Sequence, residues 1–172
     1  MSIQYRKGDL LDAFKSGEID ILVHGCNCYK TMGAGIAKQI KEQYPEAYEI
    51  DCKDYPSWEL PSDRLGAFTF VKYGRKHCGQ SCHNTAYIIN AYTQETYWDN
   101  ERMLSYQAIK DVFTKIKNTP SFNKLSIGIP FIGCGLAGGD WKKVSQILEE
   151  VFDDRTIYVY YLSDEEFKRN TL

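Results

Sequence analysis

Apolar residues follow two periodicities along this chain. Continuous apolar runs in EIDILVHGCN (residues 18–27) and LSIGIPFIG (residues 125–133) have the length of buried strands. In residues 101–118 and 140–152, apolar residues instead recur every three or four positions, which is typical of amphipathic helices. This alternation predicts an α/β fold with a mixed, mainly parallel central sheet that helices cover on both faces.

The remaining segments extend this alternation. Residues 33–50 predict a helix that stops or bends near Pro45, because proline cannot continue the hydrogen-bond ladder. Residues 51–64 are irregular. The other predicted elements are a first strand and turn in IQYRKGDLLD, a β-hairpin formed by GAFTFVKY and TAYIINAY, and a last strand in TIYVYYL.

Length and charge narrow the class of protein. The chain has 172 residues and a formal net charge of −2, which predicts a single domain over residues 1–172 without a basic field for duplex nucleic acid. The opening MSIQYRKGDLLD lacks the apolar segment of a signal peptide, and no apolar run reaches the length of a membrane span. We therefore expect a cytoplasmic monomer without a membrane partner.

The six cysteines are expected to be free thiols in such a protein. HCGQSCH (residues 77–83) contains four residues of metal-ligand type, but its spacing matches no common zinc pattern. We interpret it as a polar loop and predict no metal site, with zinc binding as the alternative.

Two glycine-rich segments each follow a predicted strand and precede a helix: HGCNCYKTMGAGIA (residues 24–37) and GIPFIGCGLAGGDW (residues 128–141). Loops of this kind offer backbone N–H groups and the positive end of a helix dipole to an anion. Glycines that only serve an unusual backbone conformation are the alternative. Neither segment has the P-loop or dinucleotide-binding pattern.

Together with KGDLL (residues 7–11), these segments resemble the successive motifs of a macro domain, the ADP-ribose-binding fold. The resemblance runs from about Lys7 to Phe152 and is greatest to stand-alone ADP-ribose-1″-phosphate phosphatases and to the terminal ADP-ribose protein glycohydrolase type. It implies a three-layer α/β/α sandwich that binds ADP-ribose or ADP-ribose 1″-phosphate.

The resemblance also implies the ligand-binding residues. Asp9 matches the acid that accepts a hydrogen bond from adenine, and Asn27 the amide that contacts the distal ribose. Tyr92 is a candidate to shield that ribose, although a buried strand tyrosine is an equal alternative. The other predicted binding residues are Leu10, Gly25, Met32, Gly33, Ala34, Gly35, Ile36, Ala37, Asn90, Ile132, Gly133, Cys134, Gly135, Leu136, Ala137 and Gly138.

His24 and Asp140 are the predicted catalytic pair. His24 directly follows the apolar residues of the strand that leads to the first loop. Asp140 is the last residue of the second loop, directly before a helix. A histidine and a carboxylate beside the terminal ribose would suit hydrolysis of a phosphate monoester, and the phosphatase branch has similar positions. Asp140 is also a favoured N-cap for the helix that follows, so both interpretations stay open.

The glycohydrolase branch uses a lysine at the end of the strand that matches YIINAYTQ and an aspartate directly after GCGL. This chain has neither residue there. We therefore predict a phosphatase that converts ADP-ribose 1″-phosphate to ADP-ribose and needs no cofactor. The alternatives are a non-catalytic ADP-ribose reader and a hydrolase that acts on ADP-ribosylated protein or nucleic acid.

Overall fold

The computed structural model describes residues 2–75, 83–98 and 102–172. At its centre is a six-stranded sheet in the order β1-β6-β5-β2-β4-β3. Every described pair of neighbours is parallel except β3 and β4, which form the predicted hairpin. The mixed, mainly parallel sheet is thus confirmed. The strands are β1 (Ile3–Lys7), β2 (Ile21–Asn27), β3 (Phe68–Gly74), β4 (Thr85–Gln94), β5 (Ile127–Ile129) and β6 (Ile157–Tyr161).

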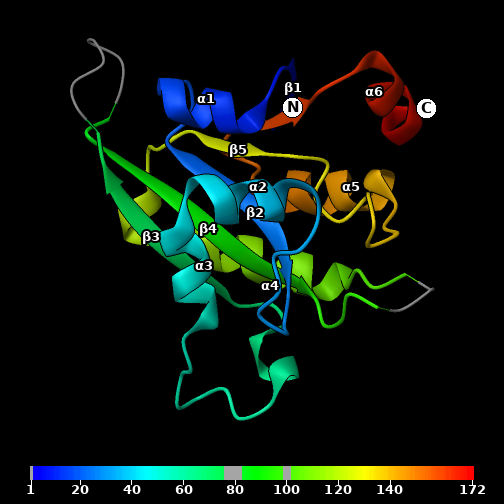
Figure 1. The fold of residues 1–172 in the computed structure, drawn as a ribbon. Helices are drawn as coiled ribbons and strands as arrows, with labels where there is room; N and C mark the ends of the chain where they lie inside the picture. Colours follow the sequence, from blue (N-terminus) through cyan, green and yellow to red (C-terminus); the bar gives the residue numbers. More distant parts are fainter. Residues whose placement is uncertain (1, 76–82, 99–101) are drawn as a thin grey trace.

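Helices cover both faces of the sheet, so the three-layer arrangement is also confirmed. Figure 1 shows α2 and α3 in front of the sheet and α4 behind it. The helices are α1 (Leu10–Ser16), α2 (Gly35–Gln43), α3 (Pro45–Cys52), α4 (Tyr106–Lys117), α5 (Trp141–Val151) and α6 (Asp164–Thr171), with short 3₁₀ turns η1 (Pro61–Arg64) and η2 (Pro120–Phe122).

The central strand β2 contributes to the cores on both faces of the sheet. Ile21 and Val23 pack with α4 and α5, whereas Leu22 packs with α1 and α2. Successive side chains of a strand point to opposite faces, so a strand covered on both sides reads as one continuous apolar run. This is the physical reason that β2 was recognisable in the sequence.

One boundary confirms the sequence-based expectation and one differs from it. The helix predicted in residues 33–50 stops near Pro45 as expected: α2 ends at Gln43, and α3 begins with Pro45 at its first position, where the missing N–H costs nothing. β5 ends at Ile129 because Pro130 has no N–H for the sheet ladder, so the chain leaves the sheet four residues earlier than Gly133.

A buried polar network holds the irregular segment 51–64 against the sheet. Arg64 Nη1 donates to the Asp51 carbonyl at 2.7 Å and lies 3.4 Å from the Asp51 carboxylate. Tyr92 Oη on β4 donates to the same carboxylate at 2.7 Å. Burial raises the pKa of Asp51, although the Tyr92 hydrogen bond and the Arg64 charge act in the opposite direction.

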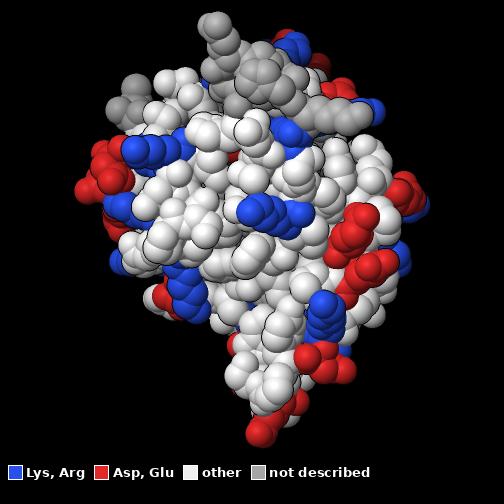
Figure 2. Space-filling view, turned by 90° about the vertical axis from the view of Figure 1, so that its left-hand side faces the viewer, with Lys and Arg blue, Asp and Glu red and all other residues white. Residues whose placement is uncertain are grey.

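None of the helices in the described ranges combines the length and apolar composition needed to cross a bilayer. On the face shown in Figure 2, lysines and arginines are scattered among uncharged and acidic residues rather than joined into a continuous basic surface.

Candidate ligand-binding cavity

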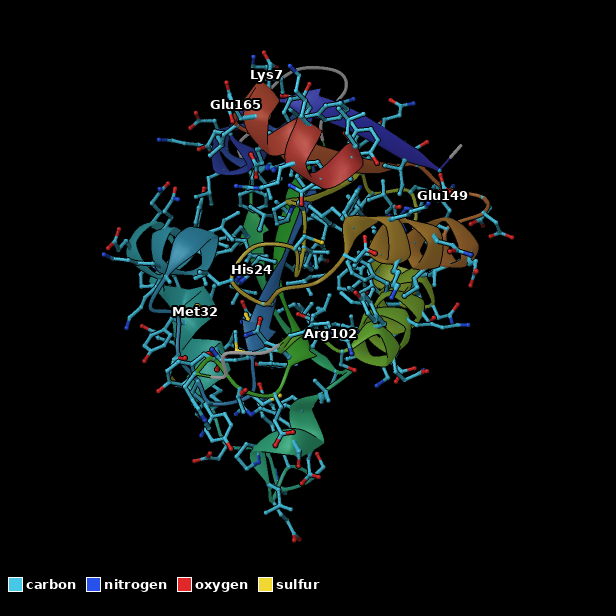
Figure 3. All side chains as sticks on the ribbon, turned by 90° about the vertical axis from the view of Figure 1, so that its right-hand side faces the viewer. Lys7, His24, Met32, Arg102, Glu149 and Glu165 are labelled. Carbon is cyan, nitrogen blue, oxygen red and sulfur yellow. The ribbon has the colours of Figure 1, made fainter. Side chains whose placement is uncertain are left out.

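A cavity of about 700 Å³ opens at the carboxyl ends of the parallel strands. Figure 3 looks toward this edge: α2 lies on one side of the loop that follows β5, α5 on the other side, and α6 above it. In α/β proteins ligands bind at this edge of the sheet. The predicted binding residues that line the cavity are Asp9, Leu10, Gly25, Asn27, Gly33, Ala34, Gly35, Ile36, Ala37, Ile132, Gly133, Cys134, Gly135 and Leu136.

The cavity has two distinguishable ends, because its lining residues come from opposite parts of the sheet. Asp9 and Tyr160 lie at the end formed by β1 and β6, whereas Asn27 and Gln94 lie at the end formed by β2 and β4. The loop after β5 lies between them. An elongated ligand with chemically different ends fits this arrangement.

Asp9 caps α1 and still presents an unused acceptor. Its Oδ1 accepts the N–H groups of Leu11 at 2.8 Å and Asp12 at 3.1 Å. No residue of the described chain donates to its other oxygen, Oδ2. Because Asp9 also lines the cavity, Oδ2 can accept a hydrogen bond from a ligand without loss of the cap.

The N-terminus of α2 faces the cavity without a side-chain cap. α1, α4, α5 and α6 all begin with an Asp or Ser side chain that accepts a backbone N–H, but Ala34 at the start of α2 accepts none. Gly35, Ile36 and Ala37, which form the first turn, line the cavity. Their N–H groups and the helix dipole favour an anion at this point.

The glycines of the two loops serve different purposes. A Cβ atom on Gly133 or Gly139 would come within 2.4 or 2.3 Å of Leu104, so packing requires glycine at both positions. In contrast, Gly33 and Gly135 have no positive φ, and a Cβ atom on either would meet no protein atom within 4 Å. Both line the cavity, so the space beside their backbone is open to a ligand.

Asn27 lines the cavity, but its side chain already stabilises its own loop. Its Nδ2 donates to the carbonyl and hydroxyl oxygens of Thr31, at 3.0 and 2.7 Å, and its Oδ1 accepts the Tyr29 N–H at 2.9 Å. Both amide hydrogens are therefore engaged, and one Oδ1 lone pair is left for a ligand hydroxyl.

The structure does not bring His24 to the cavity. Its side chain is completely buried, and its Nε2 lies 2.7 Å from Asn90 Oδ1. Asn90 Nδ2 donates to the Ala47 carbonyl and to Thr69, so Oδ1 is the acceptor and His24 Nε2 is the donor. Burial lowers the pKa of His24 to about 4, so the ring is neutral near pH 7.

Asp140 does not line the cavity either. Its Oδ1 accepts the Lys142 N–H at 2.9 Å, and this bond caps α5. Of the two open interpretations of Asp140, the structure shows the cap. His24 and Asp140 occupy different environments, the first in the core beside α3 and the second on the surface.

Five predicted binding residues also lie outside the cavity lining. Met32 packs in a small core with Cys26, Cys28 and Tyr92, and Tyr92 belongs to the Asp51 network. Ala137 accepts the N–H groups of Met103 and Leu104 through its carbonyl, and Gly138 forms a turn at a φ of 70°. The five are Met32, Asn90, Tyr92, Ala137 and Gly138.

Cys134 lines the cavity as a small residue. Burial raises the pKa of its thiol to about 12, so the thiolate that a nucleophile requires is scarce at neutral pH.

Sequence reasoning missed the contribution of α6 and the residues before it to the cavity. Glu166, Arg169 and Asn170 of α6 line it, and so does Leu162, which follows β6. β6 lies next to β1 and runs parallel to it, so the segment after β6 must emerge at the same edge as Asp9. The strand order, which the sequence does not state, was the missing information.

In the described ranges, no three His, Cys, Asp or Glu residues lie close enough together to hold a metal ion. Most of the HCGQSCH motif lies outside the described residues. Of this motif, His83 is described, and its Nδ1 lies 3.1 Å from Asp20 Oδ2.

Comparison with known proteins identifies the family. The Macro domain family model matches residues 23–148, and the chain therefore belongs to the macro domain family. A structure entitled macrodomain of Mycobacterium tuberculosis DarG superposes with a TM-score of 0.68 and 28% identity, over 94% of this chain and 98% of that one.

Three proteins of similar sequence carry different names. An uncharacterised 17.5 kDa protein of Enterobacteria phage T4 is 33% identical over 87% of this chain and 89% of its own length. An ADP-ribose 1″-phosphate phosphatase of Meyerozyma guilliermondii is 26% identical over 86% of this chain and 93% of its own length. A DNA ADP-ribosyl glycohydrolase of Mycobacterium tuberculosis is 34% identical over 87% of this chain but only 38% of its own length.

Proposed function

We propose that the cavity binds the ADP-ribose unit and that the protein hydrolyses ADP-ribose 1″-phosphate to ADP-ribose and phosphate. The observation that carries the binding part is the uncapped N-terminus of α2, which faces the same cavity as the open backbone at Gly33 and Gly135. Two loops with available N–H groups suit a diphosphate.

The two ends of the cavity orient the ligand. The free Oδ2 of Asp9 suits the exocyclic amine of adenine, which can only donate to it. With the diphosphate at the start of α2, the distal ribose then lies at the end formed by β2 and β4, near Asn27 and Gln94. Its C1″ substituent faces outward at that end.

Two considerations favour a phosphate as this substituent. The phosphatase relative matches over nearly its whole length. In addition, Gln94 lies at the strand end where the glycohydrolase branch uses lysine, and an amide is no nucleophile. The leaving oxygen is bonded to an anomeric carbon, whose ring oxygen withdraws electrons, so its departure needs less proton donation than that of an ordinary alcohol.

The direct test is phosphate release from ADP-ribose 1″-phosphate by the parent protein and by Asp140→Asn. Asparagine keeps an Oδ1 acceptor for the Lys142 N–H but removes the charge. If Asp140 is a cap alone, we expect both proteins to release phosphate at rates within about two-fold of each other.

The controls separate binding from catalysis. Calorimetry with ADP-ribose reports the cavity, and circular dichroism reports the fold. A folded protein that binds ADP-ribose but releases no phosphate contradicts the phosphatase. ADP-ribosylated protein would then distinguish a hydrolase of modified proteins from a reader. A large loss of turnover in Asp140→Asn alone would instead assign Asp140 a part in the chemistry.

A further inference from the structure

Thr93, which precedes Gln94 on β4, carries a buried hydroxyl group without a hydrogen bond. The residue is 0% exposed, and no atom of the described residues lies within hydrogen-bond reach of its Oγ1. A buried hydroxyl that makes no hydrogen bond lowers the stability of the folded chain, and buried polar groups are nearly always paired. The Thr93 hydroxyl therefore points to a partner that the polypeptide itself does not supply.

A bulge in β4 determines where this hydroxyl lies. Cys26 of β2 pairs with Tyr92 of β4. The next pair is Asn27 with Gln94, so Thr93 is an extra residue that has no partner on β2. Asn27 and Gln94 both line the cavity, so the bulge lies at the β2–β4 end. β-Bulges are frequent beside functional sites, where they change the direction of a side chain.

Gly25 leaves the Thr93 hydroxyl directly behind the cavity wall. A Cβ atom on Gly25 would come within 2.9 Å of Thr93 Oγ1 and 3.3 Å of Ile132 Cγ1. The φ of Gly25 is not positive, so its backbone conformation does not require glycine. Gly25 and Ile132 both line the cavity. A glycine inside a strand is typical of a site where another group approaches closely.

Ile132 is the side chain that separates Thr93 from the cavity. It is 1% exposed although it lines the cavity, and it shares with Thr93 the space beside Gly25. Ile132 belongs to the loop after β5, outside the sheet and the helices. A change of its rotamer therefore needs no rearrangement of the strands that hold Thr93.

We propose that Thr93 binds the distal ribose: when ADP-ribose occupies the cavity, the Ile132 side chain moves aside and the Thr93 hydroxyl forms a hydrogen bond with a hydroxyl group of that ribose. Each of these two groups can donate and accept. The inference rests on the ADP-ribose-binding part of the proposed function, with adenine at Asp9, and not on phosphatase activity.

The experiment compares the dissociation constants of ADP-ribose and ADP by calorimetry. ADP keeps the adenosine and the diphosphate but lacks the distal ribose. Thr93→Val removes the hydroxyl and keeps the shape of the side chain, whereas Thr93→Ser keeps the hydroxyl. Thr69→Val is the matched control, because Thr69 is also buried in the sheet but its Oγ1 accepts Asn90 Nδ2 at 3.0 Å.

We expect Thr93→Val to bind ADP-ribose about five- to ten-fold more weakly than the parent and to bind ADP equally well. Thr93→Ser should bind both ligands as the parent does. Without ligand, Thr93→Val should melt about 2–4 °C higher than the parent, because it removes the unpaired hydroxyl.

Thr69→Val should instead melt at a lower temperature, because it removes a hydrogen-bond partner of Asn90, and its affinities for both ligands should be those of the parent. A purely structural role of Thr93 does not produce higher stability together with weaker ADP-ribose binding.

Several outcomes overturn the proposal. Unchanged ADP-ribose affinity in Thr93→Val shows that the hydroxyl does not reach the ligand. An equal loss for ADP places Thr93 at another part of the ligand. A lower melting temperature of Thr93→Val shows that the hydroxyl already has a partner within the protein. These three results overturn this inference alone, whereas a parent that fails to bind ADP-ribose overturns it together with the proposed function.

Discussion

At the scale of single residues, one carboxylate can have a structural and a binding role at once. Asp9 and Asp140 both cap a helix through Oδ1, yet only Asp9 lines the cavity. The two aspartates look alike in the sequence, since each precedes a helix after a glycine. What separates them is the direction of the loop that carries them, and local sequence does not encode that direction.

His24 gives a prediction about stability and pH. Its pKa of about 4 in the folded protein lies below the ordinary 6.5, so the unfolded chain binds more protons between these values. The free energy of unfolding is therefore about 3 kcal/mol higher above pH 6.5 than near pH 4, and this difference is lost as the pH falls from 6.5 toward 4. Urea denaturation of the parent at pH 7.5 and 4.5 should show this loss.

His24→Gln isolates the effect, because glutamine keeps an N–H donor but does not titrate. We expect this variant to be less pH-dependent than the parent over the same interval and to bind ADP-ribose as the parent does. Loss of turnover with unchanged folding and ADP-ribose binding would contradict the structural role of His24 and support the catalytic one.

At the scale of elements, the sequence predicted the strands and helices that have a continuous pattern of apolar residues. The buried strands, the hairpin and the amphipathic α4 and α5 followed from periodicity. The early end of β5 at Ile129 is caused by Pro130 and was not expected. The break between α2 and α3 is caused by Pro45 and was expected near that residue. The contribution of α6 depends on strand order, which arises from contacts distant in sequence.

The two loops give a prediction at this scale. Gly135→Val adds a side chain where no protein atom lies within 4 Å, so we expect an unchanged melting temperature. The same side chain would occupy ligand space and reduce ADP-ribose affinity by about ten-fold or more, the size of an overpacking penalty. Calorimetry and thermal melting measure the two quantities.

Gly74→Val is the matched control, because a Cβ atom on Gly74 also meets nothing within 4 Å but Gly74 lies at the end of β3. It should leave ADP-ribose affinity unchanged. Equal affinities of Gly135→Val and Gly74→Val would show that the ligand does not approach the loop after β5.

At the scale of the whole molecule, the Asp51 network joins parts that are distant in the sequence. We expect Arg64→Met to lower the free energy of unfolding by about 3–5 kcal/mol, because the substitution leaves the Asp51 carboxylate buried without its cation. Lys53→Met, on the exposed surface of the same segment, should have little effect. Urea denaturation tests both, and equal stabilities would show that the network adds no net stability.

The arrangement of the chain ends has a practical consequence. Ser2 precedes β1 and accepts the Ile157 N–H at the start of β6, at the edge of the sheet away from the cavity. Leu172 follows α6, two residues after Asn170, which lines the cavity. An affinity tag or fusion partner joined ahead of Ser2 begins far from the ligand, whereas one joined after Leu172 begins at the cavity wall and can obstruct it.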